Sequence, residues 1–92
     1  MRISSDNPKH GFQFPGTFEL SAMGTAGVEL ERELPRLLMA AGVQVLEEQV
    51  SWRHSSNGHY VSVRIAFRAQ DRAQYEAAHQ ALRDHPEVKW TL

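Results

Sequence analysis

The dipeptide Asn57-Gly58 constrains the fold of this chain most, because it is the strongest two-residue signal for a β-hairpin. A type I′ turn at these two residues requires positive φ at both of them. Folding the chain about this turn places one set of side chains on one face: Val61, Val63 and Ile65 opposite His54, Trp52 and Val50. The other face then carries Tyr60, Ser62, Arg64 and Arg68 opposite Ser55, Arg53, Ser51 and Glu47. The first face is mostly apolar and the second mostly polar, so turn chemistry and alternation agree on one register.

Apolar periodicity before the hairpin predicts a strand and a helix. Residues 17–23 alternate between apolar and polar, which indicates a half-buried strand that ends at Gly24. From residue 30 to residue 41 the apolar positions follow helical spacing, and Gly42 supplies the usual C-terminal stop. Pro35 lies inside this segment, and the apolar stripe continues in phase across it. We therefore expect one helix that bends at Pro35.

The remainder of the chain predicts a second helix and a last strand. Asp71 and Gln74 form a capping pair for a helix that His85-Pro86 ends. The inner face of that helix is expected to carry Tyr75, Ala78, His79 and Leu82. In the last strand, the inward residues are expected to be Val88, Trp90 and Leu92, with Lys89 and Thr91 outward.

The resulting element order is βαββαβ, with Glu47–His54 as the second strand. It predicts an α+β, ferredoxin-like two-layer sandwich, in which a four-stranded antiparallel sheet of order 4-1-3-2 carries two helices on one face. Residues 1–13 contain proline and glycine without periodicity and are expected to form a flexible N-terminal arm. Residues 14–92 are expected to form a single domain.

Composition restricts the classes of function. The 92 residues carry a formal net charge of −1 and no cysteine, which argues against a polyanion binder and excludes cysteine-ligated zinc. No apolar run approaches the roughly 18–20 residues of a membrane span, and no secretory signal is visible, so we expect a cytoplasmic protein. None of the five histidines forms an i, i+4 pair. We therefore expect neither a metal site nor a cofactor.

The residues of enzyme active sites are not assembled in this sequence. No serine lies in a Gly-x-Ser-x-Gly turn, and no phosphate-binding loop follows the first strand. The acidic groups Glu29-x-Glu31-x-Glu33 and Glu47-Glu48 are interpreted as solvated charge. We expect no catalytic residue, and a binding or regulatory module in place of an enzyme.

Several segments resemble the YbeD-type family of small bacterial domains of unknown function, over about residues 14–92. They are Phe14-Pro15, Met23-Gly24, the hairpin Ser55–Val63 and the closing segment Leu82–Leu92. Two departures are the absence of Lys or Arg in the hairpin turn and the polar Thr91, where the family tends to be apolar. The resemblance implies a ferredoxin-like fold similar to ACT-type regulatory domains and no established activity.

The segment Gly24-Thr25-Ala26-Gly27, between the first strand and the first helix, has three interpretations. Glycines at such a junction are first of all ordinary turn residues. In ACT-type domains a glycine in this connection lines a small-ligand site at a dimer interface, so the resemblance makes these four residues a candidate ligand-binding site. The Gly-x-x-Gly spacing also occurs in nucleic-acid-binding KH domains, but there it joins two helices and carries basic residues, which argues against nucleic acid.

The sheet face that the helices leave open is the second candidate site. Its predicted partner-binding residues are Arg53, Tyr60, Ser62, Arg64, Arg68 and Lys89. This mildly positive face suits an acidic protein surface, a small anionic metabolite or a second copy in a weak homodimer, and a purely solvated face is the other interpretation. Tyr60 is its only predicted aromatic residue, which argues against stacking of single-stranded RNA. Two free sheet edges, Glu47–His54 and Val88–Leu92, offer an alternative route to a protein partner.

Overall fold

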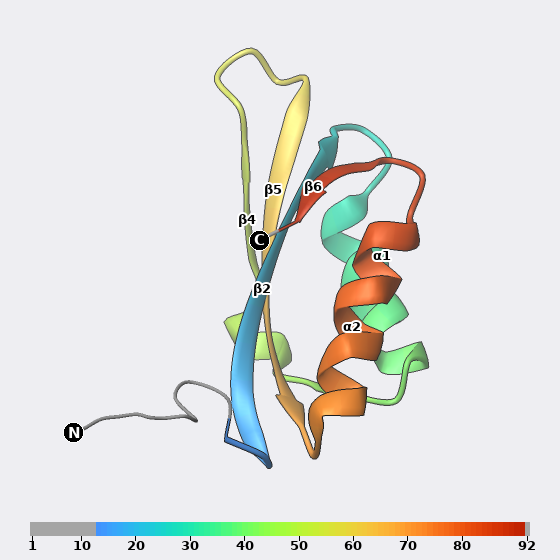
Figure 1. Cartoon of the computed structure of the whole chain (residues 1–92). Coiled ribbons are helices and arrows are strands. Elements are labelled where there is room, and N and C mark those ends of the chain that lie inside the picture. Colours follow the sequence, from blue (N-terminus) through green and yellow to red (C-terminus); the bar gives the residue numbers. More distant parts are fainter. Residues whose placement is uncertain (1–12, 92) are drawn as a thin grey trace, which may run out of the picture.

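Two ten-residue strands, β2 (Gly16–Thr25) and β5 (Tyr60–Ala69), form the centre of the sheet in the computed structural model, which describes residues 13–91. They pair antiparallel along their whole length. The other elements are α1 (Leu30–Ala40), β3 (Gln44–Val45), the 3-10 turn η1 (Glu47–Gln49), β4 (Ser51–His54), α2 (Arg72–Asp84) and β6 (Val88–Thr91). Both helices cover the same face of the sheet, and the other face is bare (Figure 1). The predicted ferredoxin-like class is confirmed. Residues 1–12 of the predicted arm and Leu92 of the predicted last strand lie outside the described residues.

The sheet order also agrees with the prediction, except that the second strand is divided. β6 pairs with β2, β2 with β5, and both β3 and β4 pair with β5 on its other side. Within β4 the predicted register is confirmed, with His54 opposite Val61 and Trp52 opposite Val63.

The prediction of a continuous strand from Glu47, with Glu47 opposite Arg68, is wrong. Residues 47–49 form η1 instead, and β3 takes over with Val45 opposite Phe67. An uninterrupted strand would have placed Glu48 opposite Phe67, which is fully buried. Burying an unpaired carboxylate costs free energy. Because residues 47–49 form the turn, the apolar Val45 lies opposite Phe67 in place of Glu48.

The hairpin closes with a wider loop than the predicted type I′ turn. Gly58 has a φ of +77°, but Glu29 is the only non-glycine residue with positive φ in the described part of the chain, so Asn57 does not adopt the predicted conformation. Asn57 Oδ1 instead accepts hydrogen bonds from Ser55 Oγ, at 2.7 Å, and from the His59 amide, at 3.0 Å. The four-residue loop has the same midpoint as the predicted turn, which is why the register of β4 is unchanged.

Helix α1 is one helix that includes Pro35, as its uninterrupted apolar stripe predicts. Its C-terminus is a Schellman motif: the Gly42 amide donates to the Met39 carbonyl, and the Val43 amide donates to the Leu38 carbonyl. Gly42 has a φ of +95°, which explains the need for glycine at this stop. The fully buried face of the helix consists of Leu30, Leu34 and Leu38.

The last strand contains a β-bulge that overturns its predicted orientation. Met23 lies opposite Trp90, whereas the next residue of β2, Gly24, lies opposite Val88, so Lys89 is the extra residue. The extra residue reverses the alternation. Trp90 therefore shares the open face with Met23, and Thr91 faces the helices.

The first prediction concerns the cap of α2. Asp71 Oδ1 accepts a hydrogen bond of 2.9 Å from the Gln74 amide, which confirms the predicted cap. We expect Asp71→Ala to lower the free energy of unfolding by about 1 kcal/mol, measured by urea denaturation. The matched control is Asp84→Ala at the other end of α2, where removing a negative charge is expected to be neutral or slightly stabilising. Equal losses in the two variants would contradict this account of the cap.

Candidate partner-binding face of the sheet

The structure places five of the six predicted partner-binding residues on the open face. Tyr60, Ser62, Arg64 and Arg68 alternate along β5 with buried residues of the core, and Arg53 lies opposite Ser62 on β4. Lys89 is the extra residue of the bulge in β6 and lines a hollow with Arg83 of α2, so its predicted place on the open face stays a prediction.

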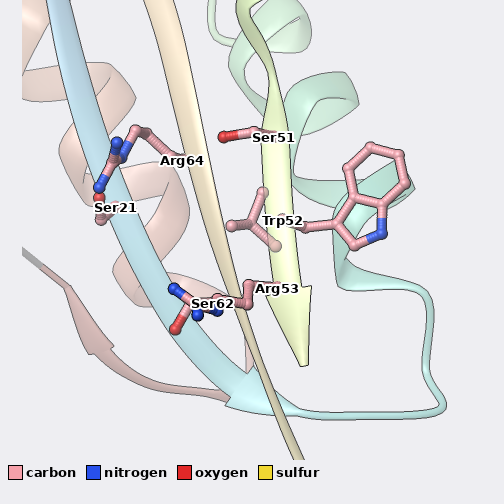
Figure 2. A pocket seen from close by; sticks show the side chains of 7 residues that line it. Ser21, Ser51, Trp52, Arg53, Ser62 and Arg64 are labelled. Atoms are coloured by element: carbon pink, nitrogen blue, oxygen red, sulfur yellow. The ribbon is translucent and has the colours of Figure 1, made fainter. Parts of the chain in front are cut away.

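A polar hollow occupies the middle of the open face. Its polar side chains are Ser21 of β2, Ser51 and Arg53 of β4, and Ser62 and Arg64 of β5. Figure 2 shows Arg53 extending across β5 toward Ser62, and Arg64 extending toward Ser21. The hollow therefore combines two guanidinium groups with three hydroxyl groups.

The charge of this face is positive and largely uncompensated. Arg64 Nε lies 3.8 Å from Glu19 Oε1, and both side chains are more than half exposed. An exposed pair at this distance contributes little. Neither Arg53 nor Arg68 forms an ion pair within the described residues. A guanidinium can donate two parallel hydrogen bonds to a carboxylate or phosphate, so the hollow suits an anionic group.

An apolar hollow adjoins the polar one and shares Ser21 and Ser62 with it. Its apolar lining comes mainly from Met23 and Trp90. The rings of Tyr60 and Trp90 meet edge to face with centroids 6.4 Å apart. Met23, Tyr60 and Trp90 are 37%, 39% and 58% exposed, which is high for large apolar side chains. We call these three residues the aromatic patch.

Sequence reasoning missed Trp90 as part of the site. Strict alternation along the last strand assigned it to the core, and a bulge has no dependable signature in one sequence. The available signal was Gly24, because a glycine inside a strand often marks a bulge or a close approach of another backbone. Both are present, since the Thr25 amide donates to the Glu87 carbonyl at 3.1 Å beside the bulge.

The residues lining the two hollows contain no histidine or carboxylate. None of these side chains could take a proton from a serine hydroxyl at neutral pH. In the described part of the chain, no group of three or more histidines and carboxylates could hold a metal ion. The side chains that line the two hollows can form hydrogen bonds, ion pairs and apolar contacts.

The predicted ligand segment, residues 24–27, is tied into the fold. Strand β2 continues to Thr25, so the prediction that it ends at Gly24 is wrong. Besides the Thr25 amide, the Ala26 amide is also engaged, since it donates to the His59 carbonyl at 2.9 Å. A small ligand at Gly24, Thr25, Ala26 and Gly27 stays a prediction.

Two histidines have structural hydrogen bonds. His79, which was predicted on the inner face of α2, is part-buried, and its Nε2 lies 3.1 Å from Thr91 Oγ1. His85 connects the two helices: its Nδ1 accepts a hydrogen bond of 3.0 Å from the Glu87 amide, and its Nε2 lies 3.0 Å from Glu33 Oε1. The amide at Nδ1 assigns the proton of the neutral ring to Nε2.

Comparison with known proteins finds similar sequences and adds no activity. The family model described as "Protein of unknown function (DUF493)" matches residues 9–92. UPF0250 proteins of Xanthomonas axonopodis pv. citri and Stenotrophomonas maltophilia are 77% and 73% identical over the full length of both chains. None of these names denotes an enzyme. No helix within residues 13–91 is long and apolar enough to span a membrane.

The solution structure of protein HP0495 from H. pylori has a similar fold. Its TM-score is 0.73 at 16% identity, over 100% of this chain and 97% of that one. The predicted resemblance to the YbeD-type family is confirmed by the family match and the close relatives. The chain therefore belongs to the family of proteins of unknown function named DUF493.

Proposed function

We propose that this protein is a non-catalytic binding module whose open sheet face holds an acidic and partly apolar segment of a partner protein. The observation that carries the proposal is the position of the aromatic patch directly beside Arg53 and Arg64. Large apolar side chains and arginine are the residue types enriched at protein interfaces.

The positive charge of the open face favours an acidic segment over a second copy of this chain as its binding partner. The described residues of the open face include Arg53, Arg64 and Arg68 but one carboxylate, Glu19. Two copies stacked face to face would bring two positive surfaces together, which is unfavourable. An acidic segment would neutralise them.

The apolar half of the site favours a protein over a small anion or a nucleic acid. A small anion would fill the polar hollow and leave the aromatic patch exposed. Single-stranded nucleic acids stack their bases on open ring faces. Tyr60 and Trp90 meet edge to face, and Met23 lies opposite Trp90, so the patch offers a hollow for a side chain and no flat platform.

The test is a titration of the whole chain with labelled peptides, followed by fluorescence anisotropy at physiological salt. One peptide combines Glu with Phe and Leu, a second replaces Glu by Lys, and a third replaces Phe and Leu by Ser. We expect only the first to bind. Trp90→Ala should weaken its binding about 30-fold, as for an interface hot spot, and Arg64→Glu about tenfold.

The control variant is Arg36→Glu, on the exposed surface of α1 on the helix side, and it should leave the affinity within about twofold. Citrate and a single-stranded oligonucleotide are titrated in parallel. Tighter binding of either one, no binding of the acidic apolar peptide at millimolar concentration, or equal effects of Arg64→Glu and Arg36→Glu would contradict the proposal.

A further inference from the structure

Strand β4 (Ser51–His54) is a free edge of the sheet. Within residues 13–91 it pairs only with β5, and all four of its residues are exposed. The Ser55 amide donates to the Tyr60 carbonyl, at 2.9 Å, on the β5 side. Backbone groups alternate in direction along an antiparallel edge, so the amide and carbonyl of Trp52 and of His54 point outward. These groups are available to a further strand.

The side chain of Trp52 is exposed on the helix side of this edge. Figure 2 shows it pointing away from Arg53 and Arg64, which lie on the open face. Trp52 is 53% exposed and Met39 of α1 is 44% exposed. Both line a groove between α1 and β4, with Pro35 and Val50 also in its lining.

We propose that two copies of this chain pair through β4 in an antiparallel, two-fold symmetric arrangement, with Trp52 of one copy opposite Trp52 of the other. This register joins the outward-pointing backbone groups of both Trp52 residues by two hydrogen bonds. The two-fold axis is perpendicular to the sheet, so the helices of both copies stay on the same side. The two indole rings then cover each other between the two copies of α1.

The charges around the groove favour a second copy as the occupant. Its charged lining residues are Glu31, Glu47, Arg32 and Arg36, with one acidic residue for each basic residue. Such a surface has no net charge and can complement itself across a two-fold axis, unlike the positive open face. On the open side of the pairing, Arg53 lies opposite Ser51 of the second copy, so no like charges meet.

The length of the edge sets the strength of the dimer. Stable interfaces bury about 1,200–2,000 Å² in total, and smaller ones are typically transient. A four-residue edge with one exposed tryptophan is at the small end of this range. The dimer should therefore form at high micromolar to millimolar concentration.

Sedimentation equilibrium of the whole chain, combined with tryptophan fluorescence, tests this pairing. In a Trp90→Phe background, Trp52 is the only tryptophan. We expect the average mass to rise toward that of a dimer with concentration, while Trp52 emission shifts to the blue and acrylamide quenching falls about twofold, as expected for a ring leaving water. Constant emission over this concentration range would overturn the pairing.

Variants at the edge separate this pairing from other modes of association. Trp52→Lys places two like charges opposite each other and should abolish the dimer. Ser51→Glu places a carboxylate opposite Arg53 of the second copy and should tighten the dimer several-fold. Arg64→Glu, on the open face, should leave self-association unchanged. A dimer that persists in Trp52→Lys, or is lost in Arg64→Glu, would contradict the pairing whatever the open face binds.

Discussion

Gly24→Ala is expected to lower the free energy of unfolding by about 3 kcal/mol or more, because no space exists for a side chain at this position. An added Cβ would lie 2.1 Å from the Glu87 carbonyl oxygen and 2.6 Å from Leu30 Cδ1. The carbonyl belongs to the backbone that leads into the bulged strand β6, and Leu30 is the fully buried first residue of α1. Relieving the clash requires β2, β6 and α1 to move apart.

The matched control is Gly27→Ala, three residues away. Gly27 has a φ of +91° and nothing within 4 Å of an added Cβ, so its substitution carries backbone strain alone, about 1 kcal/mol. Urea denaturation of both variants measures the difference. Equal losses would show that conformational freedom and not close packing requires glycine at position 24. The comparison also bears on the ligand hypothesis. Because Gly24→Ala disturbs the fold, a loss of ligand binding in this variant is not evidence that Gly24 contacts a ligand.

Phe67→Ala is expected to cost about 3–5 kcal/mol, the range for removing a buried aromatic ring from a core. Phe67 is fully buried. Its ring centroid lies 6.2 Å from that of Phe18 on β2 and 6.0 Å from that of Tyr75 on α2, so one side chain connects the sheet to a helix. The cavity would lie between the two layers, where neither can collapse without disturbing the other.

The control for this variant is Val28→Ala, which removes apolar atoms from an exposed position and should cost less than about 0.5 kcal/mol. Thermal and urea unfolding measure both. A loss below about 1.5 kcal/mol in Phe67→Ala would contradict the assignment of this ring to the centre of the core.

The sequence predicted the parts of the fold in which local chemistry and apolar pattern act together. The stop of α1 at Gly42, the cap of α2 at Asp71 and the pairing of Trp52 with Val63 are all present. The errors occur where tertiary packing interrupts a regular pattern. Residues 47–49 leave the strand because Glu48 would otherwise face Phe67, a conflict that appears only when β5 is in place.

The sequence predicted the polar half of the candidate site and Tyr60 of its apolar half, and it missed Trp90. Arg53 and Arg64 follow from the hairpin register, which the sequence specifies directly. Trp90 depends on a bulge opposite Gly24, so a single extra residue moves the most exposed aromatic side chain from the expected core to the open face. That difference adds Trp90 to Tyr60 on the open face.

The central claim is that the open face meets a partner protein in the cell, and site-specific photo-crosslinking in cells of the native host tests it most directly. A benzophenone amino acid is placed at Ser62, which lines both hollows, or at Gln80, on the exposed surface of α2. The account predicts that the probe at position 62 crosslinks to an acidic segment of another protein and that the probe at position 80 does not. Crosslinks from position 80 alone, or equal yields from both positions, would contradict it.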